Sequence, residues 1–191
     1  MSVVEGRSGR DQLLEAALEY FAANGVHNES LRSLAANIGT SHRMLNYHFG
    51  SREGLLAAVV DAVEQRQRLA YAALMDSVGT NLPRTATRAF WNRVVDEAIA
   101  YGPLVFELAA HAMQGERHAK GLRDTLVTPW IDILTESLVQ AGRDPAIAPV
   151  QARLALGVVN GLIFDLLLTG DRSGADAAHG LFMDLIGLDD G

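Results

Sequence analysis

Residues 41–52 read SHRMLNYHFGSR, and this polar stretch decides how the rest of the chain is interpreted. An α-helix turns about 100° per residue, so Leu45 and Phe49 fall on the same side of it. Arg43 and Tyr47 then point almost directly away from them. We therefore predict a short helix that packs on a core through its apolar side and shows solvent a guanidinium and a phenol.

A second short helix precedes this one. Ser30 is a good N-cap residue, and Gly39 is a good stop. The apolar face between them is formed by Leu31, Leu34, Ala35 and Ile38. Two short helices joined by a tight turn are typical of a helix-turn-helix, whose second helix enters the major groove of DNA.

The outward side chains suit DNA recognition. Arginine can bond guanine, asparagine can bond adenine, and methionine can pack on a thymine methyl group. Serine hydroxyls at helix starts and nearby basic or phenolic groups suit phosphate. For His48, packing at the helix end is an equal alternative. The predicted DNA-contacting residues are Ser30, Arg32, Ser41, His42, Arg43, Met44, Asn46, Tyr47, His48 and Arg52.

The net charge of −7 at first argues against a nucleic-acid partner. The charge is uneven, however: between residues 27 and 52 three arginines oppose Glu29 alone, a local charge of +2. Because salt screens charges beyond about 8–10 Å, the local charge matters most. A small basic face on an acidic body can therefore bind a polyanion.

Composition sets the class of the whole chain. Its 191 residues, 49% hydrophobic and 20% charged, predict a globular protein with a sizeable core. The absence of cysteine excludes disulfides and thiolate metal sites and fits the cytoplasm. The most apolar run, residues 154–168, is shorter than a membrane span and carries Asn160 and Asp165, so we predict a buried helix there. We expect no cofactor, metal or membrane association.

Helical patterns cover the rest of the sequence, and no alternating run suggests a strand. Before the helix-turn-helix, an apolar stripe ends at Asn24-Gly25, a typical left-handed stop. After it, a capped helix is predicted over 51–78. The remaining predicted helices span 84–101, 104–114, 120–141, 147–169 and 174–187, with a break at Gly102-Pro103. The fold class is therefore all-α.

Around this motif the sequence resembles the TetR family of transcriptional regulators. The likeness covers roughly residues 10–60. It rests on Ser30-Leu31-Arg32-Ser33-Leu34-Ala35, Ile38-Gly39-Thr40-Ser41, Leu45, Tyr47-His48-Phe49-Gly50-Ser51-Arg52-Glu53 and Leu55-Leu56. The family commonly has a small residue in place of Arg43 and a tyrosine in place of Asn46. These departures bear on the operator sequence rather than on DNA binding itself.

The resemblance implies a two-part architecture and a function. Residues 1–50 would form a DNA-binding domain, and residues 51–191 a helical ligand-binding and dimerisation domain, with 51–78 as the connector. The expected function is operator-binding regulation by a homodimer, by family habit a repressor, that a small and largely apolar effector releases. Residues that combine rings with isolated polar groups are the predicted effector contacts: Trp91, Tyr101, Phe106, His111, Trp130, Asn160, Phe164 and Asp165.

A predicted dimer surface lies in the last two long helices. Gly157 and Gly161, four residues apart, would let another helix approach closely, and Leu181 and Leu185 belong to an apolar stripe. The spacing alone favours packing within one chain. The resemblance favours a four-helix interface with the partner.

Two other functions compete with the regulator. A helical protein-interaction module would use residues 42–49 as a protein contact, and the steep salt dependence of DNA binding separates it from a regulator. A small helical enzyme is the second. The sequence contains no GxSxG elbow, P-loop or HExxH motif, so we expect no enzymatic activity.

Overall fold

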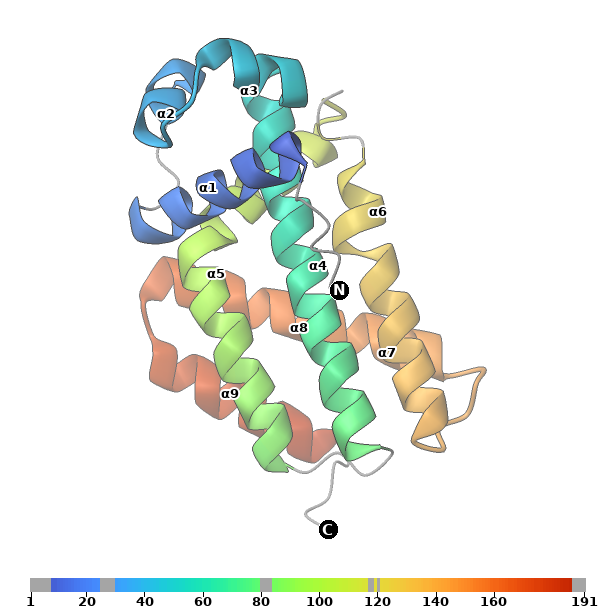
Figure 1. Cartoon of the computed structure of the whole chain (residues 1–191). Coiled ribbons are helices and arrows are strands. Elements are labelled where there is room, and N and C mark those ends of the chain that lie inside the picture. Colours follow the sequence, from blue (N-terminus) through green and yellow to red (C-terminus); the bar gives the residue numbers. More distant parts are fainter. Residues whose placement is uncertain (1–7, 25–29, 80–83, 117–118, 120, 187–191) are drawn as a thin grey trace, which may run out of the picture.

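The computed structural model describes residues 8–24, 30–79, 84–116, 119 and 121–186, and within these residues it is built of helices with no strand. Figure 1 shows the N-terminal helices at one end of the molecule and the later helices forming the rest of it. The predicted all-α class is confirmed. Gly25 and Glu29, which entered the sequence analysis, lie outside the described residues, as does the predicted helix end at residue 187.

Helices α1 (Gly9–Asn24), α2 (Leu31–Asn37) and α3 (His42–Phe49) form the predicted helix-turn-helix domain. Ser30 and Ser41 cap α2 and α3 through their side chains, as their positions predict. Gly39, with φ of 71°, occupies the left-handed region in the turn between the two helices. Leu34 and Leu45 are buried against α1 and α4, which fixes the orientation of α3.

The connector α4 (Arg52–Val78) begins at the cap Ser51 and ends at Gly79, close to the predicted bounds. Figure 1 shows it running from the helix-turn-helix through the rest of the molecule. Its apolar stripe, which includes Leu55, Leu56 and Val59, packs on the same core as α1 to α3. A shift of α4 would therefore move the helix-turn-helix with it.

Helix α5 (Arg84–Met113) corrects one prediction, because it runs through Gly102 and Pro103 without a break. The flanking residues Tyr101 and Leu104 are buried, so tertiary packing outweighs the one hydrogen bond that proline removes. Glycine also permits a close crossing: a Cβ at Gly102 would lie 2.6 Å from Cδ1 of Leu167.

A second correction concerns residues 120–141. The predicted single helix is two, α6 (Leu122–Leu126) and α7 (Thr128–Gln140). Val127 lies outside regular helix geometry, with φ of −117° and ψ of −60°. Pro129 has no N–H to continue a helix from α6, but it is well accommodated in the first turn of α7.

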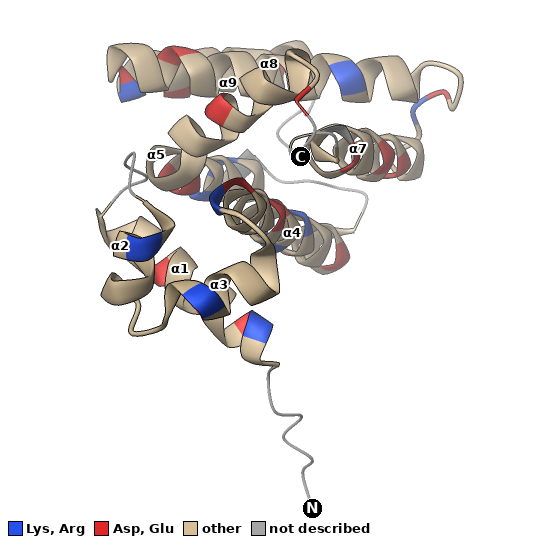
Figure 2. Ribbon diagram, turned by 90° about the horizontal axis from the view of Figure 1, so that it is seen from above, with Lys and Arg blue, Asp and Glu red and all other residues tan. Residues whose placement is uncertain are grey.

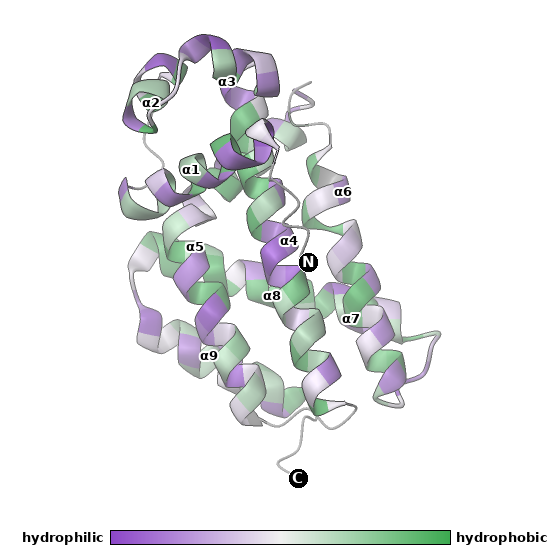
Figure 3. Cartoon of the chain, viewed as in Figure 1, coloured by the Kyte–Doolittle hydropathy of each residue, from purple (hydrophilic) through white to green (hydrophobic). Residues whose placement is uncertain are grey.

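Helices α8 (Ala148–Thr169) and α9 (Arg172–Leu185) follow, and α8 is not the buried helix that its composition suggested. It has a large apolar exposed face, on which Leu154, Phe164 and Leu168 are 59%, 50% and 70% exposed. Figure 3 shows hydrophobic colour along much of it. The bounds of α8 agree with the helix predicted over 147–169. At 22 residues it is the one described helix that is long and apolar enough to cross a membrane. Length and composition alone are weak evidence for a membrane span, because α8 packs on α5, α7 and α9.

Two apolar clusters hold the helices together. One joins α1 to α4 with Tyr101, Leu104 and Leu108 of α5. The other joins Trp91 and Val95 of α5 to α8 and α9. Because the first cluster is continuous across residue 50, the helix-turn-helix and the first part of the larger domain share one core. The domain boundary at residue 50 stays a prediction.

Candidate DNA-reading surface and effector cavity

The outward face of α3 is as the helical wheel predicts. Leu45 is fully buried, whereas Tyr47 is 80% exposed and Met44 42% exposed. Arg43 and Asn46 are also exposed. The helix therefore presents a guanidinium, a phenol, an amide and a thioether to solvent, in one short segment that a rigid core supports.

Three serine caps hold the ends of the helices around this face. The Oγ of Ser30 accepts a hydrogen bond from the backbone N–H of Ser33 at 3.1 Å, and Ser41 does the same for Met44 at 3.2 Å. Ser51 caps α4 by accepting from the N–H of Gly54 at 3.1 Å. Each hydroxyl keeps its proton to donate, so capping is compatible with a phosphate contact by Ser30 or Ser41.

The two histidines of α3 differ in environment. His42 is exposed, with a ring nitrogen 3.4 Å from the side-chain nitrogen of Asn46. His48 is half-buried, and its ring meets that of Tyr47 edge-on with centroids 4.9 Å apart. The half-buried ring of His48 is compatible with both predictions, packing at the helix end and a DNA contact.

Exposed arginines lie on the two helices of the turn. Arg32 of α2 and Arg43 of α3 are both exposed, and Figure 2 shows a basic position on each of these helices. Arg10 of α1 lies over the Phe49 ring, 5.2 Å from its centroid. The acidic residues that give the chain its net charge belong mostly to the longer helices (Figure 2).

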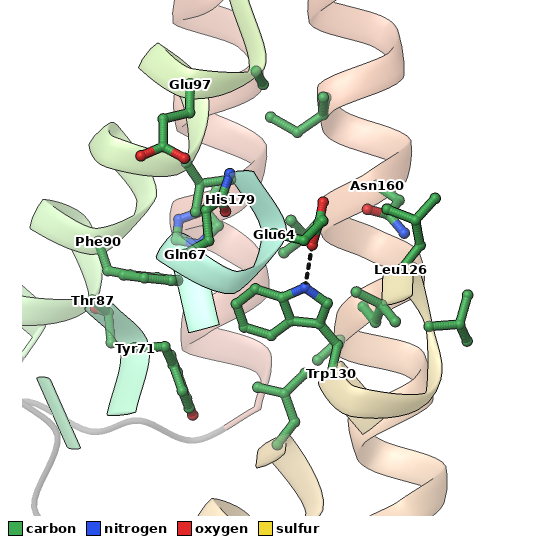
Figure 4. A pocket seen from close by; sticks show the side chains of 18 of the residues that line it. Glu64, Gln67, Tyr71, Thr87, Phe90, Glu97, Leu126, Trp130, Asn160 and His179 are labelled. Atoms are coloured by element: carbon green, nitrogen blue, oxygen red, sulfur yellow. Dashed lines mark hydrogen bonds between the residues drawn. The ribbon is translucent and has the colours of Figure 1, made fainter. Parts of the chain in front are cut away.

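A cavity of about 600 Å³ lies among α4, α5, α7, α8 and α9. Its wall is largely apolar, with rings from Tyr71, Phe90 and Trp130 and with single polar groups between them. Figure 4 shows these side chains converging on the space from several helices. This combination of apolar wall and few polar groups is typical of small-molecule sites.

Four of the eight predicted effector contacts line this cavity, and they are Tyr101, Phe106, Trp130 and Asn160. The other four are not among its lining residues. Trp91 is buried between α5 and α9, where it donates to Asp176 at 2.7 Å and stacks on His179 at 4.2 Å. Aromatic and polar residues within an apolar helix pattern can face core, cavity or solvent, and composition does not distinguish them.

The three remaining predicted contacts have other positions. His111 is in the last turn of α5. Phe164 and Asp165 are on the exposed side of α8, although the Phe164 ring touches that of Phe106, with centroids 5.5 Å apart. Four of the eight predicted effector contacts therefore lie outside the cavity lining.

Sequence reasoning missed two acidic residues in the cavity wall, Glu64 of α4 and Glu97 of α5. Glu64 accepts a hydrogen bond from the indole N–H of Trp130 at 2.6 Å (Figure 4). Burial raises the pKa of Glu64, and although the Trp130 bond and the Arg68 charge act in the opposite direction, burial outweighs them. The position of Glu64 in the sequence was the signal that could have indicated its burial, because Glu64 directly follows Val63, a buried residue of the apolar stripe of α4.

The cavity is connected to the DNA-binding domain. Tyr101 lines the cavity, and its hydroxyl donates to the backbone carbonyl of Leu18 in α1 at 2.9 Å. On the surface, Arg66 of α4 pairs with Glu15 of α1 at 2.7 Å. Helices α4 and α5 therefore carry both cavity-lining side chains and bonds to α1.

Comparison with known proteins agrees with this architecture. Residues 13–59 match the model of the family described as bacterial regulatory proteins, tetR family. The chain is 32% identical over 138 residues to the transcriptional regulatory protein RaaS of Mycobacterium tuberculosis, which covers 70% of this chain and 61% of that protein. It is 27% identical over 187 residues to the regulator UidR of Escherichia coli, covering 93% and 91%.

A solved structure shows the same fold. The crystal structure of a transcriptional regulator from Rhodococcus sp. Rha1 matches with a TM-score of 0.70 at 21% identity, and covers 94% of this chain and 96% of that one. Helix-turn-helix, all-α body and sequence likeness together define a DNA-binding transcriptional regulator rather than an enzyme. The chain belongs to the TetR family of transcriptional regulators.

Proposed function

We propose that this regulator represses transcription by occupying an operator and leaves it when a small, largely apolar effector fills the cavity among α4, α5, α7, α8 and α9. One observation carries the proposal. Tyr101 lines the cavity and also donates to the Leu18 carbonyl of α1, so cavity and DNA-binding domain share a side chain. Such a protein acts in the cytoplasm, where the DNA is.

DNA recognition is assigned to the outward face of α3. Arg43, Asn46 and Met44 are the proposed base-reading residues, since their exposed side chains match the chemistry of guanine, adenine and thymine edges. The phosphate contacts are assigned to the residues around them, which are Ser30, Arg32, Ser41, His42, Tyr47, His48 and Arg52. These contacts hold α3 in the groove but carry little sequence information.

The regulator is proposed to bind as a twofold homodimer through α8 and α9. Gly157 and Gly161 are exposed, and no atom of the protomer lies within 4 Å of a Cβ built at either glycine. Leu181 and Leu185 of α9 are 60% and 76% exposed. This apolar surface suits a partner helix. Two copies of α3 would then read half-sites about 34–36 Å apart, or a multiple of that spacing.

Release follows from linkage. An effector that fits best when the two reading helices are wrongly spaced weakens operator binding, and the operator weakens effector binding by the same factor. A coupling free energy of about 1–3 kcal/mol gives a roughly fivefold to 150-fold change in operator affinity. The α4–α1 and α5–α1 bonds are the route by which a change in the cavity reaches α3.

The test begins with the operator. Purified protein is used to select bound fragments from random DNA, and the recovered sites should be palindromic or nearly so. Compounds that raise the melting temperature are then titrated against the operator complex by fluorescence anisotropy. Trp130→Ala should blunt the effector response, while Val139→Ala, an exposed change on the same helix, should not. If every stabilising compound leaves operator affinity unchanged, release by an effector is refuted.

A further inference from the structure

We propose that the effector is a lipophilic cation, held by the Glu64 and Glu97 carboxylates against a wall of aromatic rings. This inference rests on the proposed function, because it assigns a chemical class to the ligand of the same cavity. It is independent of how the ligand is coupled to DNA. Three features of the cavity carry it.

The first feature is Glu64, a carboxylate placed where water is scarce. It comes from α4 and accepts the Trp130 indole N–H at 2.6 Å, which fixes the carboxylate at the cavity wall (Figure 4). A single neutral donor only partly compensates an ionised carboxylate in such a place. A cation brought into the cavity would supply the missing charge.

The second feature is Glu97 of α5. One carboxylate oxygen, Oε1, pairs with Arg93 at 3.0 Å on the solvent side, where Arg93 is 46% exposed. The other, Oε2, is buried and has no hydrogen-bond partner among the described residues. An unpaired buried carboxylate oxygen is costly, so its place in the wall of a ligand-sized cavity indicates that a ligand meets it.

The third feature is the ring wall beside Glu64. Trp130 and Tyr71 meet edge-on with centroids 6.0 Å apart, and Tyr71 meets Phe90 in the same way at 5.4 Å. The three rings come from α7, α4 and α5, and all line the cavity. Aromatic faces attract cations and also bury apolar groups, so they favour a ligand that is both charged and lipophilic.

The basic groups nearby do not cancel the acids. Among the described residues that line the cavity, the arginine is Arg143, whose Nη2 donates to the backbone carbonyl of Ile186 at 2.7 Å. Arg68 donates to the Thr125 carbonyl at 2.9 Å and does not offset the effect of burial on Glu64. Burial lowers the pKa of His179, which keeps that lining imidazole neutral at neutral pH.

The test uses three probes of similar shape and different charge: tetraphenylphosphonium, neutral triphenylphosphine oxide and tetraphenylborate. Affinity for the full-length protein is measured by calorimetry, and operator affinity is read in parallel by anisotropy. The cation should bind roughly tenfold tighter than the neutral probe, and the anion weakest. Glu64→Gln keeps an acceptor for Trp130 but removes the charge, and should weaken cation binding by roughly tenfold.

The controls separate charge from shape. Glu97→Gln should act as Glu64→Gln does, whereas Glu107→Gln, an exposed change on the same helix as Glu97, should leave all three affinities unchanged. Triphenylphosphine oxide should bind wild type and all variants equally. Equal or tighter binding of the anion or neutral probe, failure of the cation to bind, or indifference to both cavity substitutions would overturn the cationic assignment.

The two proposals fail in different ways. If the cation binds in a Glu64-dependent manner but leaves operator affinity unchanged, the cation site stands and release by that ligand does not. If the neutral or anionic probe releases DNA as well as the cation does, the release model stands and the charge assignment falls.

Discussion

The outward face of α3 and the wall of the cavity both carry side chains to which we assign a function, but they present them in opposite directions. On α3 the functional groups point to solvent, and Tyr47 is 80% exposed. In the cavity they point inward from the same helix faces that build the core, and Tyr71 is 9% exposed. A surface site interrupts the apolar pattern of its helix, whereas a cavity site continues it.

Substitutions in the two regions should therefore have different effects on stability and binding. Substituting an exposed residue of α3 should remove a proposed contact with DNA and leave the fold nearly intact. Substituting a cavity residue changes packing, burial and ligand contact at once.

The largest effect is expected from the double change Gly157→Leu/Gly161→Leu, which should disrupt the proposed dimer and leave the cavity intact. In the proposed function the reading surface needs a second copy at a fixed spacing, whereas the cavity lies within one protomer. The double variant should be monomeric by sedimentation, and its operator affinity should fall by roughly 10³-fold or more toward the non-specific level. Ligand-induced thermal stabilisation should persist.

The protomer itself tolerates this double change, because a Cβ at either glycine meets open space. Leucine is also a better helix former than glycine, by up to about 1 kcal/mol per site. Loss of dimerisation without loss of helicity therefore reports the interface. A variant that still sediments as a dimer would remove these two glycines from the proposed contact.

Arg43→Ala should weaken specific binding by about 1–3 kcal/mol and relax the preference at one base pair in each half-site. The matched change Arg52→Ala should weaken binding to all sequences alike and lower the salt slope by roughly one unit. Both are measured by anisotropy on matched operator variants over a salt series. If Arg43→Ala weakens binding to every DNA sequence equally, Arg43 contacts phosphate instead of a base.

Tyr101→Phe tests the connection between the two regions. The variant keeps the ring in the cavity wall and loses the hydroxyl that donates to Leu18, so effector should still bind while the coupling free energy falls by about 0.5–1.5 kcal/mol. Tyr71→Phe is the control, since Tyr71 is another buried cavity tyrosine. Coupling is the ratio of operator affinities with and without saturating effector. An unchanged ratio in Tyr101→Phe would exclude this bond as the route.

The sequence predicted which side chains of α3 are exposed, and the reason is physical. In a two-turn helix with Leu45 as its anchor, the wheel leaves one orientation, and Arg43 and Tyr47 must be outward. The caps at Ser30, Ser41 and Ser51 are local, so they too can be predicted from neighbouring residues. The roles of these side chains on DNA stay predictions.

The larger domain was predicted only in outline, because its features depend on tertiary packing. Gly102 and Pro103 read as a break, but α5 continues because the α8 crossing fills the space beside it. The apolar composition of α8 suggested burial, yet one side of it is exposed and apolar. Glu64 and Glu97 look like ordinary surface acids in the sequence, and only the approach of α7 and α8 encloses them.

The smallest expected effect is the pH dependence of stability caused by Glu64. Its pKa in the folded protein is raised above the ordinary value of 4.5, mainly by burial. A group with a raised folded pKa contributes stability that is full below its unfolded pKa and is lost as pH rises through its folded pKa. Wild type should therefore lose stability relative to Glu64→Gln over that interval.

Thermal melts of the two proteins from about pH 4 to about pH 8 measure this difference. The Tm of Glu64→Gln should match that of wild type at the acid end and exceed it at neutral pH, with Glu107→Gln following wild type throughout. If the Tm difference between Glu64→Gln and wild type does not vary with pH, it arises from packing and not from the charge of Glu64. The same substitution should stabilise the fold and weaken cation binding, which is the pattern expected when a carboxylate is buried for a ligand rather than for the fold.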